Sequence, residues 1–173
     1  VRRDYDRVRG PRHPSAPFFT RGSGHNEKAQ YSEKPEDYAR NMDRLARKFD
    51  TARKHVPVSV LKGDANAEVG LIAFGSTDCP MQEALDQLSA QGMKVEYLRI
   101  RGFPFDQAVH QFIEKKKRVY VIEQNRDAQM LQLLKLDVKA ELVTRLRSVL
   151  HYDGLPVDAR SVSDGVLKQE HAK

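Results

Sequence analysis

The chain contains few side chains that could form a catalytic site. Its one cysteine, Cys79, stands close to the predicted start of a helix, where a thiolate is stabilised. Because no histidine lies near it in the sequence to act as a base, a buried or inert thiol is favoured over a nucleophile. His25 and Glu27 are close together, but two ligands do not make a metal site. We therefore predict no catalytic residue and no metal ion in this chain.

A short polar segment, Gly75-Ser76-Thr77-Asp78, is the first candidate binding site. It separates a strand-like run from a helical pattern, and backbone N–H groups at such a helix start bind anions. However, it has neither the dinucleotide fingerprint nor the Walker lysine, and Asp78 would repel a phosphate, so the nucleotide signal is weak. The alternative is that Thr77 or Asp78 only caps the helix.

A second polar segment, Glu123-Gln124-Asn125-Arg126-Asp127, follows another apolar run. Asn125 can cap the next helix, with Asp127 in the first turn of that helix. The structural alternative for this segment is that Asn125 only caps the helix and that Glu123 only bonds to the loop backbone. Cofactor-binding residues cannot be assigned from these two segments alone.

Strand-like runs alternate with helical patterns around these segments. Val69–Phe74, Val95–Ile100 and Val119–Ile122 are separated by helices, which predicts βαβ units and a parallel sheet. Two of these runs are almost wholly apolar, as expected when helices cover both faces of the sheet. Val58–Leu61 is a short additional strand candidate, and Leu146–Leu150 is the last strand. The predicted fold class is therefore α/β.

Four helices are predicted around these strands. The first covers about Pro80–Gln91, the second begins near Phe105 and ends in Lys115-Lys116-Lys117, the third is capped by Asn125, and the last covers Val157–Lys168. The three lysines suit the negative end of a helix and are predicted to be a solvated terminus. The segment from Tyr152 to Pro156 is predicted to be a turn.

The chain before this unit has two parts. Residues 1–34 form an irregular basic segment, in which Phe18, Phe19 and Tyr31 are candidate anchors for packing. Residues 35–55 form a helix that begins at Pro35. Its apolar stripe, in which each residue follows the last by three or four positions, consists of Tyr38, Met42, Leu45, Phe49 and Ala52. This helix either packs on its own domain or connects two domains, and residues 56–173 form the α/β domain.

Charge and composition exclude several classes of protein. Residues 1–55 hold 14 Lys and Arg against 8 Asp and Glu, whereas residues 56–173 hold 16 of each. The basic segment has no dense block of Lys and Arg, so we expect no nucleic-acid binding. We expect no membrane span, because no apolar run approaches the required ~20 residues. One cysteine excludes an internal disulfide, which fits a cytoplasmic protein. The start at Val1 suggests a piece of a longer polypeptide.

Four segments in this order resemble the C-terminal part of the alpha subunit of 2-oxoacid:ferredoxin oxidoreductases. The 2-oxoglutarate branch is the most similar, and the resemblance runs from about Phe18 to Leu167. The segments are Arg21–Glu27 with the Tyr38–Lys48 helix, Ala73–Asp78, Val121–Gln129 and Val149–Pro156. The fold implied is the transketolase C-terminal-like domain, a three-layer α/β/α arrangement with a mostly parallel five-stranded sheet and one antiparallel strand.

The resemblance also implies an activity for the whole enzyme. Such enzymes oxidatively decarboxylate a 2-oxoacid onto coenzyme A and pass the electrons to ferredoxin. Thiamine diphosphate, Mg²⁺ and an iron–sulfur cluster are implied for the whole enzyme, and none of them for this chain. One cysteine cannot hold a four-cysteine cluster. The implied partners are the rest of the alpha chain, the beta subunit and ferredoxin, and the chain alone is expected to be inactive.

If the implied topology holds, the first parallel strand lies between the second and the third. The two polar segments then flank the point where the strand order reverses, which is where ligands and partners of open α/β sheets bind. We call these segments, Gly75–Asp78 and Glu123–Asp127, the rim. The rim is predicted to dock the domain in the enzyme near coenzyme A without supplying a catalytic group. The alternative is a free-standing α/β module for interaction or for binding a small ligand.

Overall fold

The computed structural model describes residues 24–28 and 30–172, which form two structural units divided between Thr51 and Ala52. The anchors predicted at Phe18 and Phe19, and most of the irregular segment 1–34, lie outside the described residues. No helix in the described part of the chain is long and apolar enough to cross a membrane.

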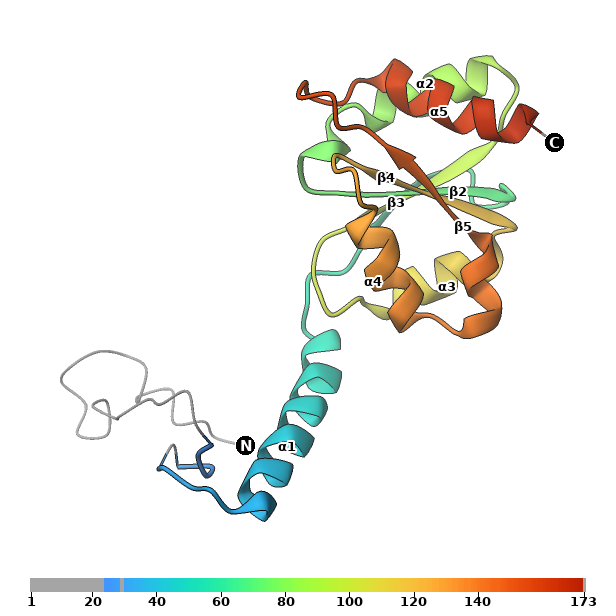
Figure 1. Cartoon of the computed structure of the whole chain (residues 1–173). Coiled ribbons are helices and arrows are strands. Elements are labelled where there is room, and N and C mark those ends of the chain that lie inside the picture. The colour runs from blue at the N-terminus through green and yellow to red at the C-terminus, as the bar shows by residue number, and fades with distance from the viewer. Residues whose placement is uncertain (1–23, 29, 173) are drawn as a thin grey trace. The chain divides into compact units, whose positions relative to one another are not determined.

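Five strands form one sheet in the order β1-β3-β2-β4-β5. Figure 1 shows this sheet between two groups of helices. Strands β2 to β5 run parallel to one another, whereas β1 pairs with β3 in the antiparallel direction. Their bounds are β1 (Val60–Gly63), β2 (Val69–Phe74), β3 (Val95–Ile100), β4 (Arg118–Glu123) and β5 (Leu146–Leu150). The predicted fold class is confirmed, including the one antiparallel strand, which begins two residues later than expected.

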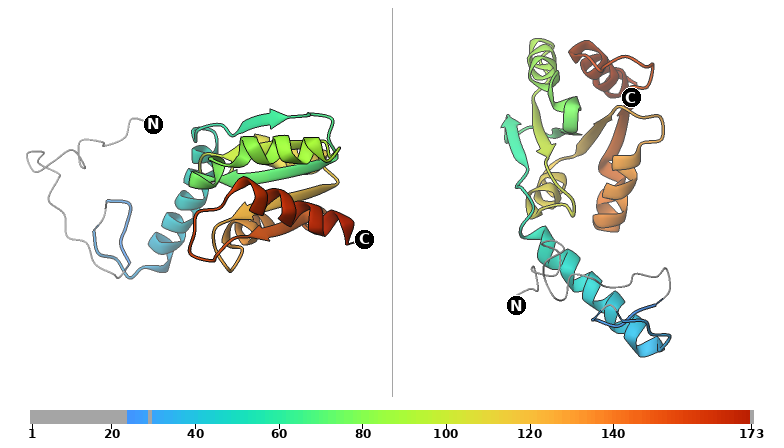
Figure 2. Two further views of the ribbon diagram at one scale, coloured as in Figure 1. Left: turned by 90° about the horizontal axis from the view of Figure 1, so that it is seen from above. Right: turned by 90° about the vertical axis from the view of Figure 1, so that its left-hand side faces the viewer.

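Helices cover both faces of the sheet and make three layers, which Figure 1 and the right-hand view of Figure 2 show. On one face lie α2 (Met81–Ala90) and α5 (Ala159–His171); on the other lie α3 (Gln107–Lys115), α4 (Gln129–Asp137) and the 3₁₀-helix η3 (Ala140–Arg145). Each face has its own apolar core, with Leu85 and Val162 in one and Phe112 and Leu134 in the other. Burial on both faces explains why β2 reads as a continuous apolar run.

Two aspartates set helix starts that the apolar pattern placed differently. The Asp106 carboxylate accepts hydrogen bonds from the Ala108 and Val109 N–H groups at the start of α3. The Asp158 carboxylate accepts from Ser161 N–H in the same way, so α5 begins at Ala159 and not at Val157.

The prediction that the three lysines form a solvated helix end is wrong for Lys116. Helix α3 ends at Lys115, and the Lys116 side chain turns inward and is only 1% exposed. Its Nζ lies 2.7 Å from the Glu96 carboxylate and donates to the Ala67 carbonyl oxygen at 2.7 Å. A buried ammonium group is tolerated here because a carboxylate and carbonyl oxygens replace its water.

Helix α1 (Pro35–Arg53) begins at the predicted proline and belongs mostly to the first unit. In that unit Asn41 Nδ2 donates a hydrogen bond to the His25 carbonyl oxygen, which ties a short bridge between His25 and Tyr31 to the helix. The apolar stripe side chains Tyr38, Met42, Leu45 and Phe49 are exposed. The packing role of this stripe stays a prediction.

Candidate functional site

The rim lies at the point where the strand order reverses. As predicted, β2 is flanked by β3 on one side and β4 on the other. The connection through α2 leads from β2 to β3, and the connection through α3 returns past β2 to β4. Gly75–Asp78 follows the carboxyl end of β2, and Gln124–Asp127 follows that of β4. The two rim segments therefore share one edge of the sheet, at its topological switch point.

The first rim segment is a single turn of 3₁₀-helix, η2 (Gly75–Asp78), and not an open loop. Neither Thr77 nor Asp78 caps α2, whose N-cap position is Pro80 and has no side-chain cap. Asp78 instead accepts a hydrogen bond from Tyr97 Oη at 2.8 Å and lies 2.9 Å from Arg99 Nη1. Burial and this carboxylate raise the pKa of Tyr97. The capping alternative for this segment is therefore wrong, and Asp78 joins the segment to β3.

Glu123 at the second segment is fully buried, at 0% exposure. One carboxylate oxygen accepts from Met130 N–H at 2.7 Å and from Asn125 Nδ2 at 2.8 Å, and the other accepts from Leu131 N–H at 3.0 Å. Glu123 therefore accepts hydrogen bonds from N–H groups in the first turn of α4 that have no partner within the helix. Ala128 occupies the N-cap position of this helix in a left-handed conformation. The carboxylate also favours the positive end of the helix. The side chain of Glu123 cannot face a partner.

Asn125 supports the same helix start, but it is not the N-cap residue. Its Oδ1 accepts from Asp127 N–H at 3.1 Å and from Gln129 N–H at 3.3 Å. Asp127 lies before α4, not in its first turn, and forms an exposed ion pair with Arg126. Asn125 and Glu123 therefore support the loop and the start of α4, although Asn125 is not the N-cap residue and Glu123 bonds to backbone N–H groups of the helix and not of the loop. Arg126 and Asp127 face solvent.

Gln124 connects three loops at this edge of the sheet. Its Nε2 donates to Thr77 Oγ1 at 3.1 Å and to Ser76 Oγ at 3.4 Å, which joins the two rim segments. Its Oε1 accepts from Val157 N–H at 3.2 Å, in the loop that follows β5. One side chain therefore fixes the relative positions of the segments predicted to act together.

The sequence reasoning did not include this third loop, between β5 and α5, in the rim. His151 N–H donates to the Glu123 carbonyl oxygen at 2.9 Å, so the loop begins beside the second rim segment. Tyr152 and Leu155 project from it and are exposed. The signal was present, because Val149–Pro156 is one of the four segments that carry the family resemblance.

The rim residues do not fit a diphosphate or a metal cluster. The Asp78 carboxylate stands at the start of the α2 connection and holds Arg99 in an ion pair, so this arginine is already engaged and does not offer its charge to a phosphate. Cys79 is exposed, not buried, and the chain has no second cysteine. Among residues 24–28 and 30–172, no three His, Cys, Asp or Glu side chains gather where they could hold a metal ion. No chemical step is assigned to this chain's side chains.

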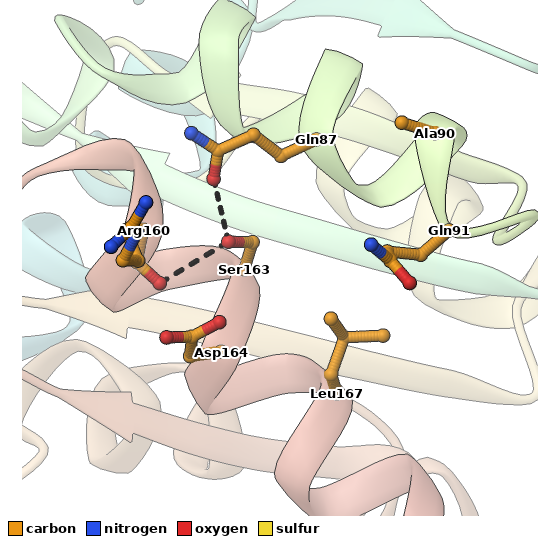
Figure 3. A pocket seen from close by; sticks show the side chains of 7 residues that line it. All are labelled: Gln87, Ala90, Gln91, Arg160, Ser163, Asp164 and Leu167. Carbon is orange, nitrogen blue, oxygen red and sulfur yellow. Dashed lines mark hydrogen bonds between the residues drawn. The ribbon is translucent and has the colours of Figure 1, made fainter.

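An open hollow of 290 Å³ lies between α2 and α5 (Figure 3). It is lined by Gln87, Ala90, Gln91, Arg160, Ser163, Asp164 and Leu167, none of which belongs to the rim. The Ser163 hydroxyl has one proton to donate and lies 2.7 Å from Gln87 Oε1 and 3.2 Å from the Arg160 carbonyl oxygen. Since neither acceptor is a general base, the hydroxyl is not an activated nucleophile, and it contributes to helix packing.

Fold and edge geometry together define an α/β domain of the transketolase C-terminal-like type. The family model described as pyruvate:ferredoxin oxidoreductase core domain II matches residues 67–162, and the chain belongs to that family.

Two curated relatives are alpha subunits. Subunit alpha of 2-oxoacid:ferredoxin oxidoreductase 2 from Aeropyrum pernix is 29% identical over 159 residues, which cover 89% of this chain and 24% of the relative. The 2-oxoacid:ferredoxin oxidoreductase subunit alpha from Saccharolobus solfataricus is 26% identical over 164 residues, covering 88% of this chain and 25% of the relative. This chain therefore spans about a quarter of the length of each.

Solved structures support the fold. A 2-oxoglutarate:ferredoxin oxidoreductase from Magnetococcus marinus, with 2-oxoglutarate, coenzyme A and succinyl-CoA bound, has a TM-score of 0.75 and 22% identity, over 92% of this chain and 28% of that one. A split-gene transketolase, described as an inactive beta4 tetramer, has a TM-score of 0.51 and 17% identity, over 64% of this chain and 40% of that one. At these identities the likeness concerns the fold alone.

Proposed function

We propose that this chain is part of the alpha subunit of a 2-oxoacid:ferredoxin oxidoreductase that acts on 2-oxoglutarate or a related 2-oxoacid. The observation that carries the proposal is the similarity to two such alpha subunits over 88–89% of this chain, together with the family match. In the proposed reaction the 2-oxoacid and coenzyme A give the acyl-CoA, CO₂ and a proton, and two electrons pass to ferredoxin. Thiamine diphosphate, Mg²⁺ and the iron–sulfur cluster are held by other parts of the enzyme.

The rim serves assembly of the enzyme near the coenzyme A site and supplies no catalytic group. Its position at the switch point supports this role, because partners of open α/β sheets bind there. The Gln124 side chain, which holds the rim segments together, also supports it, since a docking surface loses less entropy on binding when it is already ordered. The exposed pair Arg126 and Asp127 is the charged part of the rim that is available to a partner. Residues 35–55 serve as the connector to the rest of the alpha chain.

The test is made on the purified oxidoreductase that contains this chain. Ferredoxin reduction is measured with 2-oxoglutarate and with pyruvate, each with and without coenzyme A. The proposal expects reduction that requires both the 2-oxoacid and coenzyme A, and no reduction by the 173-residue chain alone. An enzyme that reduces ferredoxin with no 2-oxoacid, or does so independently of coenzyme A, overturns it.

The role of the rim is tested by Asp127→Lys, because the Asp127 side chain is exposed and its replacement spares the fold. Asp164→Lys on α5 is the matched control, since it makes the same change of charge at an exposed residue outside the rim. We expect Asp127→Lys to weaken assembly or to raise the KM for coenzyme A, and the control to do neither. If the two variants have the same assembly and the same KM for coenzyme A, the proposed role of the rim is wrong.

A further inference from the structure

The loop between β5 and α5, residues 151–158, presents two large apolar side chains to solvent. Tyr152 is 64% exposed and Leu155 is 70% exposed. Tyrosine carries much of the binding energy where proteins meet, because it buries a large area at a small cost in side-chain entropy, and an exposed leucine beside it adds apolar area that binding would bury. These two side chains stand within four residues of each other, in a loop that begins beside the rim.

The loop is held in one conformation by its own hydrogen bonds. Asp153 Oδ1 accepts from Leu155 N–H at 2.9 Å, and His151 Nε2 lies 2.9 Å from the Leu155 carbonyl oxygen. Gly154 supplies the positive φ of 91° that the turn requires. The Val157 N–H bond to Gln124 fixes the far end of the loop to the rim. Tyr152 and Leu155 are therefore displayed on a rigid support, which limits the entropy lost on binding.

The charge of the loop is negative. Residues 151–158 contain Asp153 and Asp158 and neither lysine nor arginine. The two arginines that pair with rim carboxylates are Arg99, with Asp78, and Arg126, with Asp127. This charge repels the phosphates of coenzyme A and attracts basic side chains.

We propose that the β5–α5 loop docks into a protein surface of the same oxidoreductase, where Tyr152 and Leu155 fill an apolar pocket bordered by lysine or arginine. The partner is a domain absent from this chain, which spans about a quarter of the length of its curated relatives. The inference deepens the proposed function and rests on it: the contact made by this loop, beside the rim, is to protein and not to coenzyme A.

The first measurement is hydroxyl-radical oxidation of Tyr152 and Leu155, compared between the 173-residue chain alone and the assembled oxidoreductase. Both side chains should react in the chain alone and be protected in the assembly. Addition of coenzyme A to the chain alone should leave their oxidation unchanged. Protection by coenzyme A, or protection that grows with the concentration of the chain alone, overturns the inference, because the occupant is then the cofactor or a second copy.

The second measurement is the affinity of assembly for variants of the loop. Tyr152→Ala and Leu155→Ala should each weaken assembly about tenfold, and the double variant about 100-fold, as expected for anchor residues. Tyr152→Phe keeps the ring and should stay within about threefold of wild type. Leu136→Ala on α4 is the matched control, because Leu136 is 85% exposed but lies outside the loop. All variants should unfold like wild type, since the replaced side chains are mainly in solvent.

Asp153→Asn tests the charge separately. Asparagine keeps the Oδ1 acceptor for Leu155 N–H but removes the negative charge. The Asp153→Asn variant should assemble more weakly than wild type at low salt, and the affinity of its assembly should depend less on the salt concentration. An oxidoreductase that is active with a 2-oxoacid and coenzyme A, but in which the loop variants assemble normally, overturns the inference and leaves the proposed function standing. If Tyr152 and Leu155 are protected from oxidation in an assembly that does not oxidise a 2-oxoacid with coenzyme A, the docking contact is supported and the proposed function is contradicted.

Discussion

Replacement of Glu123 by alanine is expected to destabilise the α/β unit strongly. The carboxylate is fully buried and accepts from two backbone N–H groups, those of Met130 and Leu131, and from Asn125 Nδ2. Alanine leaves both backbone donors without their acceptor, at about 1–3 kcal/mol each, and the lost Asn125 bond adds about 1 kcal/mol. The missing charge at the start of α4 adds about 0.5 kcal/mol. We expect a total loss of about 3.5–7.5 kcal/mol, a large part of the ~5–15 kcal/mol typical of a folded domain.

The loss is measured by urea unfolding of the 173-residue chain, followed by far-ultraviolet circular dichroism. Glu123→Gln keeps the shape and one acceptor oxygen, so its loss should be intermediate. Asp127→Ala is the control, because Asp127 forms only an exposed pair with Arg126, worth at most about 1 kcal/mol. If Glu123→Ala unfolds within about 1 kcal/mol of wild type with the same slope, the role of Glu123 at the start of α4 is refuted.

Three further predictions concern the packing and charge of the same unit. Gly70→Ala should cost about 1–3 kcal/mol in urea unfolding, since the added methyl carbon would lie 2.7 Å from two ring carbons of Phe112. Lys116→Ala should cost about 3–5 kcal/mol, because it leaves a buried carboxylate without its cation; Lys117→Ala is the exposed control. The hydrogen bond from the Arg53 guanidinium is the largest cause that holds the pKa of Asp137 below its usual value. The ion pair therefore contributes its full stabilisation above pH ~4, the usual pKa of an aspartate, and loses it as the pH falls through the lowered pKa. Unfolding midpoints of Asp137→Asn should therefore depend less on pH below about 4 than those of wild type.

The order and type of the elements could be predicted because they depend on local patterns. Val69–Phe74 and Val119–Ile122 are apolar runs bounded by polar segments, and such runs become buried parallel strands when helical patterns separate them. Pro35 fixed the start of α1, because proline is tolerated only in the first turn of a helix. These signals need no knowledge of distant contacts.

Roles that depend on distant contacts could not be predicted. Lys116 stands in a run of three lysines whose pattern favours a solvated helix end, yet it pairs with Glu96 on a strand 20 positions earlier. Asp78 is placed like a helix cap and instead bonds to Tyr97 and Arg99 on the neighbouring strand. In both cases the charged group could have served a helix end nearby in sequence, but the strand order brought a distant partner within reach, and the group bonds to that partner.

The sequence by itself determined the fold class, the two rim segments and the family resemblance, because hydrophobic periodicity and short sequence motifs are properties of contiguous residues. Only the tertiary structure decided which side chains of the rim are available. Parallel strands bring their carboxyl ends to one edge, so Gln124 reaches both Thr77 and the Val157 backbone, which are far from it in sequence. The same arrangement buries Glu123 and leaves Tyr152 and Leu155 exposed, because packing of α4 and α5 against the sheet determines which parts of each loop are covered.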